Sequence, residues 1–130
     1  YRYTVRDWCW EVPAGGIRNG QQALGVAQTE LREETGGEAA NWEYVGQFYT
    51  SNGISNEVAH VFLALDVHLH ETAHEPAEVI EIHPTPISEA LRMAHANEIS
   101  DGPSALAILL CEPKLRQLIE KLKEEGTDES

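Results

Sequence analysis

Apolar and polar positions along the chain follow two periodicities, one typical of strands and one typical of helices. Alternating patterns or runs rich in β-branched and aromatic residues predict strands over residues 1–5, 8–12, 42–49, 57–67 and 78–83. Apolar residues three and four apart predict helices over 22–35 and 88–96 and on both sides of Pro113. An early helix among strands, followed by further strands and helices, predicts an α/β fold with a mixed sheet between helices.

Three residues mark the expected ends of the later helices. Ser88 is a candidate N-cap for the helix over 88–96. Pro103 suits the first turn of the next helix, where a missing N–H costs nothing. Pro113 is predicted to divide the last helical stretch in two, because proline disrupts a helix interior.

Length and cysteine content narrow the class of protein. A chain of 130 residues predicts one domain, with roughly 65–70% of its unfolded surface buried. No apolar run approaches the ~20 residues of a membrane span, and no signal peptide is visible, so we expect no membrane partner. Cys9 and Cys111 are too few for a disulfide framework, and we expect buried thiols in a cytoplasmic protein. Because the chain begins at Tyr1 within a strand pattern and without Met, we expect a further segment upstream.

The net charge of −13 is distributed unevenly. Residues 33–91 contain no Lys or Arg but eleven Asp and Glu. Like charges this dense repel one another unless they are spread out, protonated or neutralised. The charge argues against nucleic acid as a partner and favours divalent cations, with a solvated acidic surface as the alternative.

The stretch from Gly15 to Gly37 combines a glycine turn, a helix and a second glycine stop. Its last helical turn contains Glu30, Glu33 and Glu34. Glutamates four apart destabilise a helix by roughly a few tenths of a kcal/mol, and the C-terminal end of the helix dipole disfavours anions. A bound cation would supply the missing countercharge.

This stretch resembles the Nudix box, whose pattern is G-x5-E-x7-R-E-U-x-E-E-x-G-U, where U is a bulky aliphatic residue. The residues that match the pattern are Gly15, Glu30, Leu31, Glu33, Glu34 and Gly36. The residues that depart from it are Gln21 in place of the first Glu, Thr29 in place of Arg, and Gly37 in place of the final aliphatic residue. The lead-in, Glu11-Val12-Pro13-Ala14-Gly15-Gly16, resembles the branch that cleaves ADP-ribose and related nucleotide sugars.

The resemblance implies an α/β/α sandwich with a mixed sheet and a Mg²⁺- or Mn²⁺-dependent hydrolysis of a nucleoside diphosphate. On matching positions it implies metal ligation by the Ala14 carbonyl, Glu30 and Glu34. Glu33 is either a third ligand or a base that acts on water. The alternative is that this acidic helix end is a solvated surface without a role in metal binding.

The departures at Gln21 and Thr29 concern a structural pair. In the family, the Glu and Arg at these positions are thought to brace the loop against the helix. Losing both charges leaves no uncompensated ion, and we expect a hydrogen bond between Gln21 and Thr29 to replace them. The competing interpretation is a decayed or repurposed site, such as one that senses a nucleotide without cutting it.

Further site residues follow from the resemblance. A glutamate from a loop after the central strands acts on water in this branch. The candidates in order are Glu78, Glu75 and Glu81. Arg2 matches an arginine that meets substrate phosphate, and Glu57 follows a turn that resembles the branch's Ser-Pro-Gly turn. Exposed acids and a strand-surface arginine are the alternatives for these residues.

Other side chains carry weaker hypotheses. His68, His70 and His74 are loosely spaced for a specific metal site. The three tryptophans are more often core residues than base-stacking platforms. The resemblance further implies a homodimer that exchanges N-terminal strands, and a small-molecule nucleoside diphosphate substrate. A pyrophosphatase for another nucleoside diphosphate derivative is the alternative within enzymes.

Overall fold

The computed structural model describes residues 8–70 and 80–126, which form two compact units. One unit comprises Val12–Ile82, and the other combines Tyr1–Glu11 with His83–Ser130. Each unit is described here by itself. The expected α/β class is confirmed, since the described residues contain helices and an antiparallel sheet.

Helix α1, Ala23–Thr35, matches the predicted helix closely. Gln22 is its N-cap but makes no side-chain capping hydrogen bond. The helix ends at Gly36, whose φ of 73° lies in the left-handed region that glycine adopts without a steric penalty. Its N–H donates to the carbonyls of Leu31 and Arg32, so the glycine satisfies backbone groups that the helix end would leave unpaired.

Strands β1, Gly37–Tyr49, and β2, Val58–Leu69, form an antiparallel hairpin. Two of the predicted strands are thereby confirmed, although β1 begins five residues earlier than its alternation indicated. The register pairs Gly37 with Leu69 at the open end and Tyr49 with Val58 at the closed end. A bulge between Tyr44 and Gly46 shifts the pairing.

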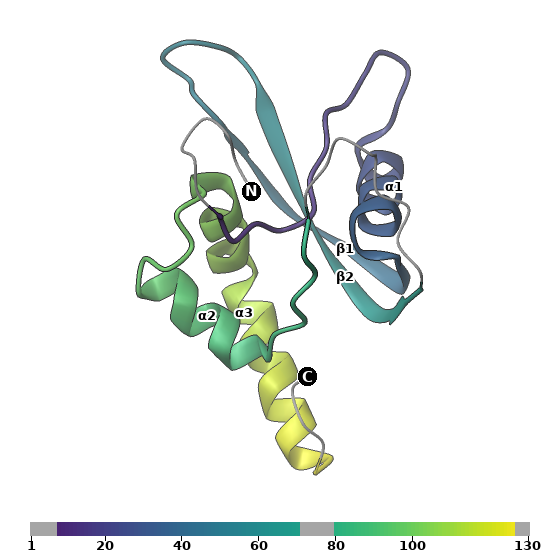
Figure 1. Cartoon of the computed structure of the whole chain (residues 1–130), viewed down its shortest axis with the longest axis vertical. Helices are drawn as coiled ribbons and strands as arrows, with labels where there is room; N and C mark the ends of the chain where they lie inside the picture. Colours follow the sequence, from purple (N-terminus) through teal and green to yellow (C-terminus); the bar gives the residue numbers. More distant parts are fainter. Residues whose placement is uncertain (1–7, 71–79, 127–130) are drawn as a thin grey trace. The chain divides into compact units, whose positions relative to one another are not determined.

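Helix α1 packs on the open end of this hairpin (Figure 1). Gly37 sits where a Cβ would crowd the Thr35 hydroxyl, Leu31 and Val67, so the chain turns tightly from helix into strand. The N–H of His70 donates to the Gly36 carbonyl at 2.6 Å. The two glycines therefore fix α1 against the sheet.

The second unit contains α2, Ile87–His95, and α3, Gly102–Glu124. Its buried residues come from both helices and the link between them: Leu91, Ala94, Ile99, Ser104, Cys111 and Ile119. Asp101 caps α3, because its carboxylate accepts from the Ser104 N–H at 3.1 Å and from the Ser104 hydroxyl at 2.6 Å. Pro103 lies in the first turn, as predicted.

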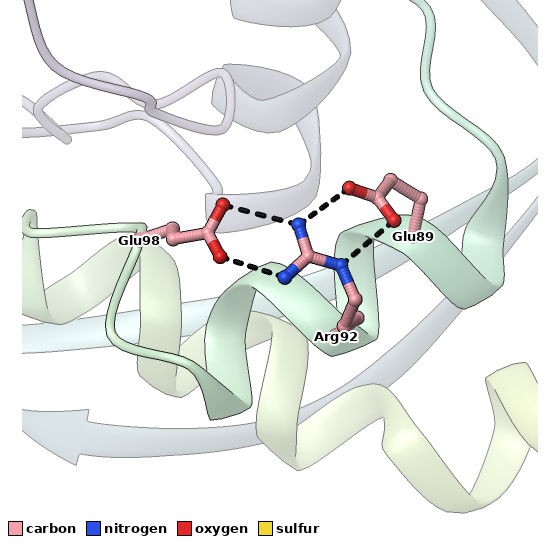
Figure 2. Close-up of polar contacts among 3 residues, drawn as sticks. All are labelled: Glu89, Arg92 and Glu98. Carbon is pink, nitrogen blue, oxygen red and sulfur yellow. Dashed lines mark hydrogen bonds and ion pairs between the residues drawn. The ribbon is translucent and has the colours of Figure 1, made fainter.

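Three exposed charged residues, Glu89, Arg92 and Glu98, form a hydrogen-bonded group on α2 and just after it. The Arg92 guanidinium lies between the carboxylates of Glu89 and Glu98 and donates two hydrogen bonds to each, at 2.6–3.1 Å (Figure 2). These bonds raise the pKa of Arg92 and hold the pKa of both glutamates below the usual range. The group ties the helix to the segment that leads into α3.

Two helix-boundary predictions are wrong. Helix α3 runs unbroken through Pro113, although proline cannot donate to the carbonyl four residues earlier. Cys111 and Ile119, which lie on either side of Pro113, are both buried, so packing stabilises the helix before and after the proline. Ser88 does not cap α2, which begins one residue earlier, after the extended Pro86.

Two strand predictions are also wrong. Residues 8–12 and 80–83 have no regular secondary structure, and the sheet in the described part of the chain has two strands. A strand needs a neighbour for its backbone hydrogen bonds, and alternation alone does not supply one. Trp10 instead packs edge-on against the His83 ring, with centroids 5.1 Å apart. The predicted strand over 1–5 lies outside the described residues.

No helix in residues 8–70 and 80–126 combines the length and apolar character of a membrane span.

Candidate active site

Gly15 and Glu30, fifteen residues apart in the chain, are in direct contact. A Cβ built on Gly15 would overlap the Cγ, Cδ and Oε1 atoms of Glu30. The adjacent Gly16 has nothing within 4 Å of the same position. The absence of a side chain at Gly15 therefore gives the Glu30 carboxylate its place against the loop.

Glu34, one helical turn after Glu30, meets the same loop. Its Oε2 accepts from the backbone N–H of Ala14 at 3.4 Å, a long hydrogen bond. Residues four apart on a helix lie one above the other, so Glu30 and Glu34 face the loop from the same side. The structure thus brings together three predicted ligand residues, Ala14, Glu30 and Glu34.

A hollow of about 670 Å³ opens between the glycine loop and α1. Its lining includes Glu30 and Glu33, so a third predicted glutamate shares this region. The other lining residues are Gly16, Ile17, Arg18, Gln21, Gln22, Gly25, Val26 and Thr29. The lining residues thus include two acids, two glutamines, a threonine and one arginine.

Gln21 and Thr29 both line this hollow, but the hydrogen bond expected between them is not the one that forms. Gln21 Oε1 accepts instead from the Arg18 N–H at 2.8 Å, and the Gln21 N–H donates to the Arg18 carbonyl at 3.0 Å. The amide at position 21 therefore braces the turn within the loop, without Thr29.

The oxygen donors gathered here are of the kind that hard divalent cations prefer. No cluster of three or more His, Cys, Asp or Glu side chains close enough to hold a metal occurs within residues 8–70 and 80–126. Two carboxylates against a backbone loop nevertheless suit Mg²⁺, which keeps several waters and uses few protein ligands. This fit of the residues to a divalent cation depends on Gly15, whose missing side chain leaves space for the Glu30 carboxylate beside the loop.

Glu57 lies elsewhere in the unit. It precedes β2 at the closed end of the hairpin, whereas α1 joins β1 at the open end (Figure 1). Its Oε1 accepts from the Thr50 hydroxyl at 2.8 Å, and its carbonyl accepts from the Thr50 N–H at 3.2 Å. In this structure Glu57 closes the turn between the strands.

The remaining predicted residues are distributed differently. Arg2, Glu75 and Glu78 lie outside the described residues. Glu81 is exposed and belongs to an irregular segment. Among the loosely spaced histidines, the His70 Nε2 atom lies 3.8 Å from Glu38 Oε2. His68 is the cross-strand partner of Glu38. His74 lies outside the described residues.

Arg18 is a lining residue that the family pattern does not mark. It occupies one of the five variable positions between Gly15 and position 21, where the motif has a glutamate and this chain has Gln21. A charge argument could have found it, because Arg18 and Arg32 are the two Lys or Arg residues in 12–82.

Comparisons with known proteins agree with the motif. The model of the NUDIX domain family matches residues 2–104. An ADP-ribose pyrophosphatase of Bacillus subtilis is 35% identical over 110 residues, 83% of this chain and 60% of the relative. An ADP-ribose pyrophosphatase of Mycobacterium tuberculosis is 34% identical over 113 residues, 84% of this chain and 54% of the relative.

A third relative has a different name. The methanol dehydrogenase activator of Bacillus methanolicus is 29% identical over 110 residues, 83% of this chain and 60% of the relative. The matched region spans 60% or less of the length of each of these relatives. The family model nevertheless covers most of the chain, from the segment before the glycine loop to the start of α3. The chain belongs to the Nudix family.

Proposed function

We propose that this protein is a Mg²⁺- or Mn²⁺-dependent Nudix pyrophosphatase that hydrolyses ADP-ribose or another nucleoside diphosphate sugar. Family membership and two relatives named ADP-ribose pyrophosphatase support this class of reaction. The observation that carries the proposal is the placement of Glu30 and Glu34 against the backbone of Ala14 and Gly15. Carboxylates one turn apart beside a backbone loop are suited to binding a hard cation from one side.

The chemistry follows from this donor set. A bound divalent cation would lower the pKa of water and offset charge on the phosphate oxygens. Glu30, Glu34 and the Ala14 carbonyl are the proposed ligands. Glu33 lines the same hollow and is either a further ligand or a base that accepts a proton from water. Water adds to one phosphorus, the bridging P–O bond breaks, and a nucleoside monophosphate and a sugar phosphate leave.

Residues beyond the described segments keep proposed roles from the resemblance. Glu78, or Glu75 as the second candidate, would act on the attacking water, and Arg2 would contact phosphate. Glu57 would orient the arginine or the ribose, in addition to closing its turn. A single domain and a homodimeric assembly are part of the same proposal.

The test is substitution of Glu34 by Gln, which keeps shape and hydrogen-bonding capacity but removes charge. We expect Glu34→Gln to reduce Mg²⁺-dependent release of AMP from ADP-ribose by at least about 100-fold, with an unchanged melting temperature. Glu38→Gln is the matched control, because Glu38 is an exposed strand residue that does not line the hollow. Undiminished turnover in Glu34→Gln would overturn the assignment.

A nucleotide-sensing Nudix domain is the second candidate. The neutral residues at positions 21 and 29 favour it, as does similarity to a relative named as an activator. Binding of ADP-ribose without product release, with Mg²⁺, Mn²⁺ and other divalent ions in turn, would support sensing. Turnover with any of them would support hydrolysis.

A further inference from the structure

Arg18 differs in charge from its surroundings. Residues 12–82 carry eleven Asp and Glu against two Lys or Arg, which are Arg18 and Arg32. Arg18 lines the hollow together with Glu30 and Glu33, whereas Arg32 lies on α1 outside the lining. Arg18 is thus the cationic residue of a lining whose other charged residues, Glu30 and Glu33, are anionic.

The guanidinium of Arg18 is not neutralised by these neighbours. Glu30 and Glu33 share the hollow with Arg18, yet neither forms an ion pair with it in the described structure. Arg18 is exposed to solvent. Its five N–H donors are therefore available to an anion that enters the hollow.

The backbone of Arg18 is nevertheless held in place. The Gln21 side chain accepts from the Arg18 N–H, and the Gln21 N–H donates to the Arg18 carbonyl, at 2.8 and 3.0 Å. These two bonds close a turn that leads through Gly20, with φ of 84°, into α1. The side chain extends from an anchored position, which lowers the entropic cost of holding a ligand.

We propose that Arg18 is a substrate-binding residue that contacts the diphosphate of the nucleotide substrate. This inference rests on the proposed hydrolase function and adds a residue to that site. A diphosphate that enters a hollow containing Glu30 and Glu33 is repelled by both carboxylates, so cations must compensate. Metal would compensate on the side of the glutamates, and Arg18 compensates from the glycine loop. The planar guanidinium fork matches two phosphate oxygens.

The experiment compares steady-state kinetics with ADP-ribose at saturating Mg²⁺ for wild type, Arg18→Gln, Arg18→Lys and Arg32→Gln. We expect Arg18→Gln to raise KM about tenfold or more while kcat changes less than about threefold. The KM of Arg18→Lys should lie between those of wild type and Arg18→Gln, because lysine keeps the charge but lacks the planar guanidinium fork. Arg32→Gln is the matched control and should leave KM unchanged, since it removes the same charge outside the hollow.

The outcomes separate this inference from the proposed function. Wild-type turnover together with an unchanged KM in Arg18→Gln would overturn the role of Arg18 and leave the hydrolase proposal standing. If wild type does not turn over ADP-ribose, calorimetric titration with ADP-ribose tests Arg18 directly. Loss of binding in Arg18→Gln but not in Arg32→Gln would then support the inference. Equal binding by both variants, or no binding by wild type, would overturn it.

Discussion

The carboxylate of Glu30 occupies the space next to the Gly15 Cα that a side chain at position 15 would fill. This contact joins the loop before α1 to the third turn of that helix. Gly15 does not have a positive φ, so its role here is to give space and not to adopt an unusual backbone angle. Any larger residue must displace Glu30.

The first prediction follows from this contact. Gly15→Ala should lower Mg²⁺-dependent hydrolysis of ADP-ribose at least tenfold, because the new methyl group displaces the Glu30 carboxylate. The free energy of unfolding should change by less than about 1 kcal/mol, because the displaced atoms are the end of a flexible side chain. Steady-state kinetics and urea unfolding measure the two effects separately.

Gly16→Ala is the control for this experiment. No protein atom lies within 4 Å of the Cβ built at Gly16, so this variant should leave Glu30 in place and lose less activity than Gly15→Ala, although Gly16 also lines the hollow. Equal activity losses at positions 15 and 16 would indicate a general intolerance of the loop and would contradict the specific role of the Glu30 contact.

The second prediction concerns the end of α1. Gly36→Ala should reduce the free energy of unfolding by about 1–2 kcal/mol, because an L-residue at a φ of 73° places its Cβ close to a backbone oxygen. Gly36→Asn should cost less, since asparagine tolerates the left-handed region. Thermal unfolding monitored by circular dichroism would measure both.

Gly25 serves as a comparison, because replacing it by alanine should change the free energy of unfolding in the opposite direction. It lies within α1, and a Cβ there meets nothing within 4 Å. Gly25→Ala should therefore stabilise the protein by about 0.5–1 kcal/mol, because alanine has less conformational freedom to lose in a helix. Destabilisation by Gly25→Ala, or stabilisation by Gly36→Ala, would contradict these backbone assignments.

The third prediction tests the cap of α3. Asp101→Ala should cost about 1–2 kcal/mol of stability, because it removes the acceptor for the N–H and hydroxyl of the buried Ser104. Asp101→Asn retains an oxygen acceptor and should cost less. Chemical denaturation of the three proteins at one pH provides the comparison, and equal losses in both variants would show that capping geometry is not the cause.

The fourth prediction concerns the pH dependence of the contact between α2 and α3. Glu112 accepts from Arg116 at 2.9 Å and from His95 at 3.0 Å, and these partners, Arg116 first, hold its pKa below the usual range. A lowered folded-state pKa contributes stability that is present above the unfolded-state value of about 4.3. This stability is lost as the pH falls through the lower folded-state pKa.

Thermal melts of wild type and Glu112→Gln between pH 7 and pH 3 would measure this effect. The variant should melt at a lower temperature at pH 7, and the difference should shrink towards pH 3. Glu120→Gln is the control, because the Glu120–Lys123 pair is exposed and its charged atoms are 3.9 Å apart. A difference between wild type and Glu112→Gln that stays constant with pH would contradict the electrostatic explanation.

Local sequence determined the elements whose ends are set by local chemistry. Apolar spacing and Gly36 defined α1, and Asp101 with Pro103 defined the start of α3. The motif spacing also determined that Glu30, Glu33 and Glu34 share the last turns of one helix, because helical periodicity fixes that geometry. The match to the Nudix pattern followed from the same residues.

Tertiary structure decided the features that depend on a distant partner. Residues 8–12 and 80–83 alternate like strands, but no strand pairs with them in the part of the chain that the structure describes. Helix α3 continues through Pro113, with buried residues on both sides of the proline. The contact of Gly15 with Glu30, and the turn that places Arg18 in the same hollow, join positions that the sequence pattern cannot bring together. Spacing along one helix sets which side chains share a face, whereas the packing of the loop on that helix sets what the face meets.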